Sequence, residues 1–208
     1  MSSQETLSEF TADTGEIDVT RTIRIKLEAS QTKLETVRTG IDAYQQVTAH
    51  MADVLPSYPP YEWNLQNTQM YYQAKRGLPD DDTNYKTTLA QMAKNDVVES
   101  YTSWRERGED GARPLGDFGD ASYLSLRHDD CELHENNRGW GVKTSFISYN
   151  PVWFHLRPGE YQRQFLERVT DPDDSASAGS AEVHLHDDET LYLHQTITWP
   201  VEVYQPDS

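Results

Sequence analysis

The stretch "VTRTIRIKLEAS", Val19 to Ser30, decides how the chain begins to fold. Successive side chains of a β-strand point to opposite faces, so an alternating pattern separates into two sets. The two sets are Ile23, Ile25 and Leu27 on one face, and Thr22, Arg24 and Lys26 on the other. This alternation predicts a half-buried strand over residues 19–27 with a basic outer face.

Three helices are predicted after this strand. Ser30, a residue type common at helix N-caps, precedes apolar residues at three- and four-residue steps that continue to Pro56. A second helix is predicted over residues 64–76. The third is predicted to start at Asp80 to Asp82, where carboxylates favour a helix N-terminus, and to stop at Gly108.

Short alternating runs separated by Gly, Asp and Asn dominate the rest of the chain. They predict strands near residues 121–127, 140–147, 151–156, 181–186 and 190–198. A helix is expected over 159–169, with loops at "GEDGARPLGDFGD" and "DPDDSASAGS". The order predicts an α+β fold in which a helical bundle is inserted into a small antiparallel β-barrel, of the wedge or oligonucleotide-binding type, after its first strand.

The charge is uneven along the chain. The formal net charge is −17, yet residues 19–108 hold eleven basic and eleven acidic side chains, and residues 109–208 hold seven basic and nineteen acidic. Such an acidic composition is typical of a protein from a high-salt cytoplasm, where screening leaves short-range phosphate contacts possible. Residues 1–18 carry five acids and no base, which predicts a flexible acidic tail.

Other features limit the cellular context. No apolar run approaches the roughly 18 residues of a membrane helix, and the start "MSSQETLSEF" is unlike a signal peptide, so we expect a cytoplasmic protein without a membrane partner. Cys131 is the single cysteine, which excludes an internal disulfide and a CxxC zinc pair. Together with His134 it has the spacing of half a zinc site, but a small, partly buried thiol in a hairpin is the simpler interpretation.

Several phrases together resemble a known family. "VTRTIRIKLEAS", "LETVRTGIDAYQQVTAHM" and "TLAQMAKNDVVESYTSWRERG" resemble the N-terminal region of TnpB-like proteins, the RNA-guided nucleases of insertion sequences that are also called OrfB-type transposases. "FHLRPGEYQRQFLERV" and "AEVHLHDDETLYLHQTITWPVEV" are similar to the strands that precede that family's nuclease domain. The resemblance covers roughly residues 19–203 and depends on pattern and order.

The resemblance implies a wedge barrel and an inserted recognition lobe that hold guide RNA and its heteroduplex with target DNA. The lobe would span residues 29–108, between the first strand at 19–28 and the remaining barrel at 109–203, with a tail at 204–208. The sequence stops at Ser208, where the RuvC-like nuclease would begin, so we expect a nuclease-free, non-enzymatic module. A transposon remnant, a regulator, and a half that assembles with a separate nuclease half all fit this expectation.

Candidate nucleic-acid contacts follow from the basic residues of the first half. Arg24 and Lys26 lie about 7 Å apart on one strand face, a spacing suited to successive phosphates. Trp63, Tyr71 and Tyr72 are candidates for base stacking, although aromatic residues at helical spacing are usually core. The full set of predicted contacts is Arg21, Arg24, Lys26, Lys75, Arg76, Lys86, Lys94, Arg105 and Arg107.

Two alternatives remain open from the residues. One is an acidic, halophilic interaction or structural protein that assembles through exposed aromatic side chains and binds no nucleic acid. The other is a metal-dependent hydrolase using "HLHDD", in which His184 and His186 share a strand face with Asp187, Asp188 and His194 nearby. The simplest interpretation is that these histidines lie on the solvent-exposed face of a strand in an acidic surface. We expect no metal or cofactor.

Overall fold

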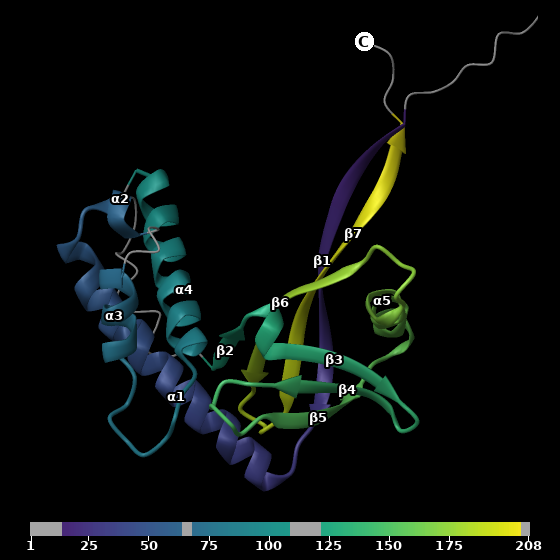
Figure 1. Ribbon diagram of the computed structural model, residues 1–208, viewed down its shortest axis with the longest axis horizontal. Coiled ribbons are helices and arrows are strands. Elements are labelled where there is room, and N and C mark those ends of the chain that lie inside the picture. The colour runs from purple at the N-terminus through teal and green to yellow at the C-terminus, as the bar shows by residue number, and fades with distance from the viewer. Residues whose placement is uncertain (1–13, 64–67, 109–121, 205–208) are drawn as a thin grey trace, which may run out of the picture.

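A computed structural model of the chain describes residues 14–63, 68–108 and 122–204. In these residues seven strands form one antiparallel sheet in the order β2-β6-β7-β1-β5-β4-β3, and the sheet curls into a nearly closed barrel (Figure 1). Between β1 and β2, the described residues form four α-helices, which stand beside the barrel. The predicted α+β class, with a helical insert after the first strand, is therefore confirmed.

The sheet is built on its two longest strands. The strands are β1 (Thr14–Glu28), β2 (Tyr123–Leu126), β3 (Cys131–Asn136), β4 (Gly139–Thr144), β5 (Val152–Arg157), β6 (Ser177–Leu185) and β7 (Leu191–Tyr204). β1 and β7 pair along their whole length, from Thr14 opposite Tyr204 to Leu27 opposite Leu191. Their far ends leave the barrel as a two-stranded ribbon (Figure 1).

The alternation predicted for β1 is confirmed by burial. Ile23, Ile25 and Leu27 are at most 3% exposed and face the core, and Arg24 and Lys26 face outward. The strand begins at Thr14, however, so the predicted acidic tail over 1–18 is wrong for its last five residues. Backbone pairing with β7 overrides their polar composition. Residues 1–13 and 205–208 of the predicted tails lie outside the described residues.

The helical insert consists of α1 (Gln31–Val54), α2 (Pro60–Trp63), α3 (Thr68–Arg76) and α4 (Thr87–Glu106). α1 begins directly after Ser30, as predicted, although the Ser30 side chain makes no capping hydrogen bond. Residues 64–67, the predicted start of the second helix, lie outside the described residues. Gly108 follows α4 with a φ of 77°, a left-handed conformation that suits glycine and ends the helix.

Asp80 to Asp82 do not start a helix, which corrects that prediction. The Asp81 carboxylate accepts hydrogen bonds from the Thr83 backbone N–H at 2.7 Å and from the Tyr85 hydroxyl at 3.2 Å. Tyr85 then forms a β-bridge with Ile147, next to the barrel. These contacts hold residues 81–85 in a non-helical conformation, and α4 begins only at Thr87.

Two strands, β3 and β6, also differ from the prediction. β3, a polar edge strand, was not predicted and pairs with β4 in a hairpin. β6 starts at Ser177, inside the predicted loop "DPDDSASAGS", and carries a register shift between Ala178 and Ala181. The predicted loop after Gly108 falls on residues 109–121, which lie outside the described residues. The helix predicted over 159–169 is confirmed as α5 (Glu160–Thr170).

Barrel and helices share one hydrophobic core. α5 contributes Leu166, which is fully buried, and Phe165, whose ring lies 5.3 Å from that of Trp199. The Cys131 thiol of β3 contacts the buried Gln195 side chain of β7 at 3.6 Å. In residues 14–63, 68–108 and 122–204, no helix is long and apolar enough to cross a lipid bilayer.

Gly40 of α1 is expected to be required for packing between the insert and the barrel. A Cβ atom there would lie 2.6 Å from the Phe146 ring and 3.0 Å from Leu124. Gly→Ala in a helix normally stabilises by about 1 kcal/mol, but overpacking a core costs about 1–3 kcal/mol. Gly40→Ala should therefore reduce the free energy of unfolding, measured by urea denaturation at fixed salt.

Ala49→Gly, on an exposed position of the same helix, is the control. It measures helix propensity alone and should cost about 1 kcal/mol. A stabilised Gly40→Ala protein would show that Phe146 and Leu124 can move away at no cost.

Candidate nucleic-acid interface

The outward face of the β1–β7 pair is polar and carries no carboxylate over its central part. The buried neighbours Ile23, Leu193 and Ile197 fix which residues point outward. Paired threonines hold the strands together here, with the hydroxyls of Thr20 and Thr198 at 2.9 Å. The outward residues are Thr20, Thr22, Arg24 and Lys26 of β1, and Tyr192, His194, Thr196 and Thr198 of β7.

Arg24 and Lys26 are both exposed on this face, as predicted from the alternation. The Arg24 guanidinium lies over the Tyr192 ring, 3.8 Å from its centroid. Stacking of this kind orders the arginine while leaving its N–H donors at the ring edge. The Arg24 carbonyl also accepts a hydrogen bond from Gln162 of α5, which ties α5 to the strand.

Further cations continue from Lys26 onto β5 and α5. Arg157 of β5 lies directly opposite Lys26. It also pairs with Glu28, the two side chains meeting at 2.5 Å between Nη2 and Oε1. A pocket of about 500 Å³ opens here, which we name the arginine pocket. Its charged and aromatic lining is Glu28, Arg138, Trp140, His155, Arg157 and Arg163.

The arginine pocket was missed by sequence reasoning. Three arginines and one glutamate line the pocket, so its formal charge is positive although the chain has a net charge of −17. The outward positions of "VWFHLR", residues 152–157, were a usable signal, because Trp153, His155 and Arg157 alternate with buried residues. Arg138 and Arg163 reach the pocket from the β3–β4 turn and α5, which sequence spacing does not reveal.

The other predicted contacts do not join this face. Arg21 belongs to the opposite face of β1, since it lies opposite the buried Ile197. Lys75 and Arg76 are exposed at the end of α3. Lys86 pairs with the buried Asp130 at 2.5 Å and so has a structural contact. The nine residues thus lie on several separate surfaces.

The α4 residues are also dispersed. Lys94 is partly buried, and this burial lowers the pKa of its ammonium. Arg105 lies 5.7 Å from the centroid of the Trp63 ring. Arg107 faces a cleft of about 450 Å³ between α4 and the sheet, together with Asp96, Glu99 and Glu182. Three carboxylates make this cleft a poor site for phosphate.

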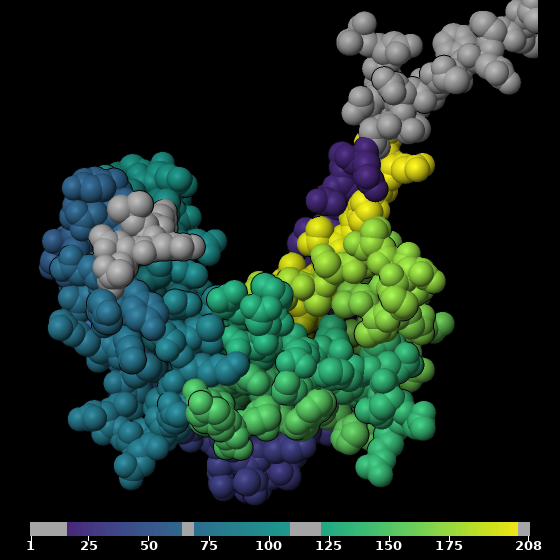
Figure 2. All heavy atoms as spheres, in the orientation of Figure 1, coloured from purple at the N-terminus to yellow at the C-terminus, as the bar shows by residue number. Residues whose placement is uncertain are grey.

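That cleft lies at the hollow between the helical insert and the barrel (Figure 2). Asp96 is its most deeply placed carboxylate and accepts hydrogen bonds from three hydroxyls, those of Tyr44, Tyr123 and Ser125. Burial raises the pKa of Asp96, although the hydrogen bonds oppose this shift. The pKa of Tyr123 is raised as well, mainly by burial and then by the Asp96 charge.

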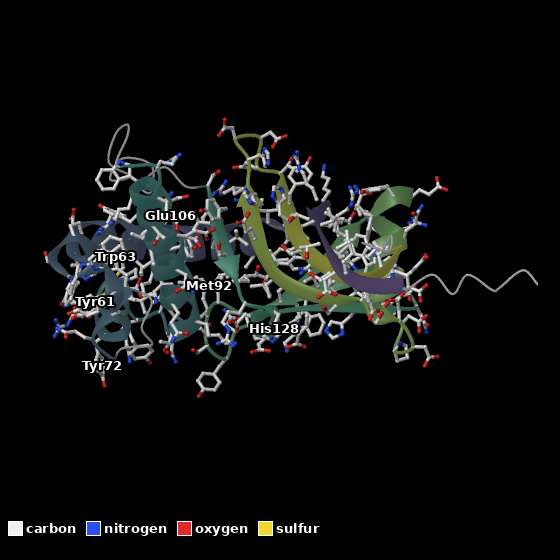
Figure 3. All side chains as sticks on the ribbon, turned by 90° about the horizontal axis from the view of Figure 1, so that it is seen from above. Tyr61, Trp63, Tyr72, Met92, Glu106 and His128 are labelled. Carbon is white, nitrogen blue, oxygen red and sulfur yellow. The ribbon has the colours of Figure 1, made fainter. Side chains whose placement is uncertain are left out.

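The aromatic stacking candidates separate into core and surface. Trp63 is 5% exposed, and its indole N–H donates to the carbonyls of Leu55 and Tyr58, so a role in base stacking is wrong for this residue. Tyr71 and Tyr72 contact each other edge to face, and Tyr72 is exposed. Figure 3 shows Tyr72 on the helical insert, at the opposite end of the molecule from α5.

Cys131 and His134 do not form half of a zinc site. The Cys131 thiol is buried and contacts Gln195, and burial raises its pKa to about 12. His134 instead lies near Glu132 and tilts against the Trp153 ring. The predicted thiol in a hairpin is confirmed, and Cys131 is more deeply buried than expected, with 3% of its surface exposed.

Comparisons with known proteins give distant similarity to solved structures alone. No protein-family model matches the sequence, and no curated protein matches it significantly. One of the similar structures is Cas12f1. A cryo-EM structure of the Cas12f1–sgRNA–target DNA complex matches with a TM-score of 0.43 and 8% identity, over 92% of this chain and 60% of that chain. The chain therefore spans less than two thirds of the length of the protein it matches.

Proposed function

We propose that this chain is a nucleic-acid-binding module of the TnpB-like type, which holds guide RNA and its heteroduplex with target DNA and does not itself cleave. The proposal is supported by the sequence resemblance and by the cationic surface of β1, β5 and α5. Sequence recognition would be left to base pairing, with the protein contacting phosphates and helix shape.

The observation that carries the proposal is the pairing of Lys26 with Arg157. Like charges directly opposite on neighbouring strands destabilise a sheet. Glu28 offsets only part of this repulsion, and Arg24, Arg138 and Arg163 add three more cations around it. Unfavourable pairs of like charge are expected at ligand-binding surfaces, where the ligand compensates for them. A phosphate backbone would supply the negative charge that balances these cations.

Four substitutions test this interface. Arg24→Gln, Lys26→Gln, Arg138→Gln and Arg163→Gln together remove four cations and leave the Glu28–Arg157 pair intact. We expect the combined variant to bind an RNA–DNA heteroduplex about 100-fold more weakly than wild type, with a salt slope lower by about 3, because each lost phosphate contact removes somewhat less than one released counterion. Fluorescence anisotropy over a potassium chloride series gives both quantities.

The matched control removes the same charge from the helical insert, through Lys75→Gln, Arg76→Gln, Arg105→Gln and Arg107→Gln. We expect its affinity to stay within about threefold of wild type. Equal losses in the two variants would show charge-driven binding without a defined face. Absence of binding by folded wild-type protein would reject the proposal and favour the acidic interaction protein.

The identity of the RNA needs a separate experiment. The protein is purified from its native host, and the co-purifying RNA is sequenced beside that of the four-cation variant. Enrichment of one discrete non-coding RNA by wild type, and its loss in the variant, supports a guide-holding role. Enrichment of bulk RNA in both preparations contradicts that role.

A further inference from the structure

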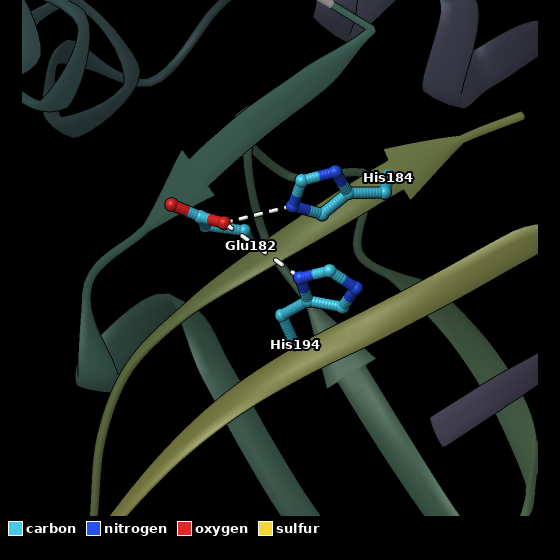
Figure 4. A group of neighbouring side chains, drawn as sticks. All are labelled: Glu182, His184 and His194. Carbon is cyan, nitrogen blue, oxygen red and sulfur yellow. Dashed lines mark hydrogen bonds and ion pairs between the residues drawn. The ribbon is translucent and has the colours of Figure 1, made fainter. Parts of the chain in front are cut away.

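Two histidines and a glutamate meet on the outward face of β6 and β7 (Figure 4). Glu182 lies directly opposite His194 in the antiparallel register, and His184 follows Glu182 by two residues on the same face. One ligand atom from each residue lies within 4.8 Å of the others. We propose that Glu182, His184 and His194 form a binding site for a zinc-class divalent cation. The proposal does not depend on the proposed nucleic-acid function.

The backbone fixes this juxtaposition. β6 and β7 are paired on both sides of the site, with Ala181 opposite Gln195 and Leu185 opposite Leu191. Val183 and Leu193 are fully buried, so the two strands are fixed from the core side. Ligands on such paired strands lose little conformational freedom when a metal binds.

The side chains already converge on one carboxylate oxygen. The Glu182 Oε2 atom lies 2.7 Å from His184 Nε2 and 4.0 Å from His194 Nδ1. The hydrogen bond from His184 lowers the pKa of Glu182, which keeps this ligand ionised. An ionised carboxylate with two imidazoles is a ligand set that zinc and its neighbours in the first transition row accept.

The two imidazole rings of the cluster are stacked on each other. His184 and His194 stack with centroids 3.9 Å apart, and Tyr123 stacks on the other side of His184 at 5.1 Å. Two imidazolium charges at such a separation would repel strongly. Burial and the neighbouring His184 lower the pKa of His194, in agreement with a ring that offers a lone pair.

One polar atom in the cluster has no partner. The Nε2 atom of His194 is buried and makes no hydrogen bond in the described structure. A metal lies in the plane of the imidazole that binds it, so the stacked rings must rotate about their side-chain bonds to share one ion. Side chains at 21% and 26% exposure leave room for that rotation.

The site has an entry path and an open side. Glu182 lines the cleft between α4 and the sheet, and Asp96 and Glu99 line the same cleft. Three carboxylates facing one cleft favour the approach of a cation. Three protein ligands leave a tetrahedral ion with one position for water.

Sequence reasoning considered "HLHDD" and chose a different third ligand. Asp187 and Asp188 are exposed in the β6–β7 turn, and His186 contacts the Tyr192 ring at 5.0 Å, outside the cluster. Glu182 was missed because only the cross-strand register with His194 reveals its place. The chain therefore offers His186, the residue directly after β6, as a matched control.

The test is zinc binding by isothermal titration calorimetry with purified, chelator-treated protein. The buffer contains magnesium at about 10 mM, which is on the order needed to occupy exposed carboxylates. Magnesium thereby suppresses nonspecific zinc binding by the acidic surface. We expect one zinc per chain in wild type and in His186→Ala. Glu182→Gln, His184→Gln and His194→Gln should each weaken zinc binding at least about tenfold, since each removes one ligand.

Cobalt(II) substitution provides a second readout that stability does not affect. Visible absorption of bound cobalt should show the intense bands of a four-coordinate ion in wild type and lose them in the three ligand variants. Circular dichroism confirms that each variant is folded. Sub-stoichiometric binding, or equal affinity in wild type and in folded ligand variants, would overturn the proposal.

Discussion

Lys86→Ala is expected to destabilise the protein by about 3 kcal/mol, at the lower end of the range for breaking a buried ion pair. The Asp130 side chain is only 5% exposed, and Lys86 is its ion-pair partner in the described part of the chain. Removing the ammonium leaves a buried carboxylate without its countercharge. The cost is at the lower end because Lys86 itself is about one third exposed. Urea denaturation at constant salt measures the change.

The Lys143–Glu132 pair is a natural control for this prediction. Its ion-pair distance is 2.7 Å, close to the 2.5 Å of Lys86 and Asp130, but its glutamate is 44% exposed. Exposed pairs contribute at most about 1 kcal/mol, so Lys143→Ala should have a small effect. Equal losses in the two variants would mean that burial of Asp130 does not decide the cost.

The position of Lys86 also bears on its predicted role as a nucleic-acid contact. Lys86 precedes α4, and its backbone N–H donates to the Phe146 carbonyl at 2.9 Å. The ion pair and this hydrogen bond fasten the start of α4 to the barrel. Lys86 is therefore assigned to the junction between insert and barrel, and Lys86→Ala should leave heteroduplex affinity unchanged once the protein is folded.

Two local patterns, in β1 and in α1, show how much of the fold could be predicted from the sequence. The alternation over residues 19–27 predicted which side chains of β1 are buried, because a strand separates its two faces strictly. The apolar spacing after Ser30 predicted α1 for a similar reason. Both patterns are local, and both were confirmed.

The predictions that failed concern residues whose structure depends on partners distant in sequence. Thr14 to Asp18 are mostly polar or small, yet they form a strand because β7 pairs with them. Asp80 to Asp82 favour a helix start, yet Tyr85 pairs with Ile147 instead. The arginine pocket combines residues from β1 to α5, more than a hundred positions apart, so only the topology places them together.

Asp96→Ala is expected to cost about 3 kcal/mol or more, since a buried donor left without an acceptor costs about 1–3 kcal/mol. Three hydroxyls, those of Tyr44, Tyr123 and Ser125, donate to the same Asp96 oxygen. Tyr44 is fully buried and Ser125 is 4% exposed, so water cannot replace the acceptor at these two. Urea denaturation at neutral pH measures the loss.

Asp96→Asn separates the role of the charge from the role of the hydrogen bonds, because the amide keeps the shape and one acceptor oxygen. The pKa of Asp96 is raised above its ordinary value of 3.8, mainly by burial. A raised folded-state pKa contributes stability that is present below 3.8 and lost as the pH rises through the folded value. The stability of wild type relative to Asp96→Asn should therefore fall as the pH rises from below 3.8 toward neutral.

Groups that titrate in the same way in wild type and in Asp96→Asn do not contribute to the difference in stability between the two proteins. Glu182, Asp174 and Glu132 have lowered pKa values and lose stability in the opposite direction, as the pH falls, but they do so in both proteins. A relative stability that stays constant over this range would show that Asp96 titrates as it does in water. A relative stability that rises with pH would show that the three hydroxyl donors outweigh burial, and that the Asp96 site is built to hold a charge.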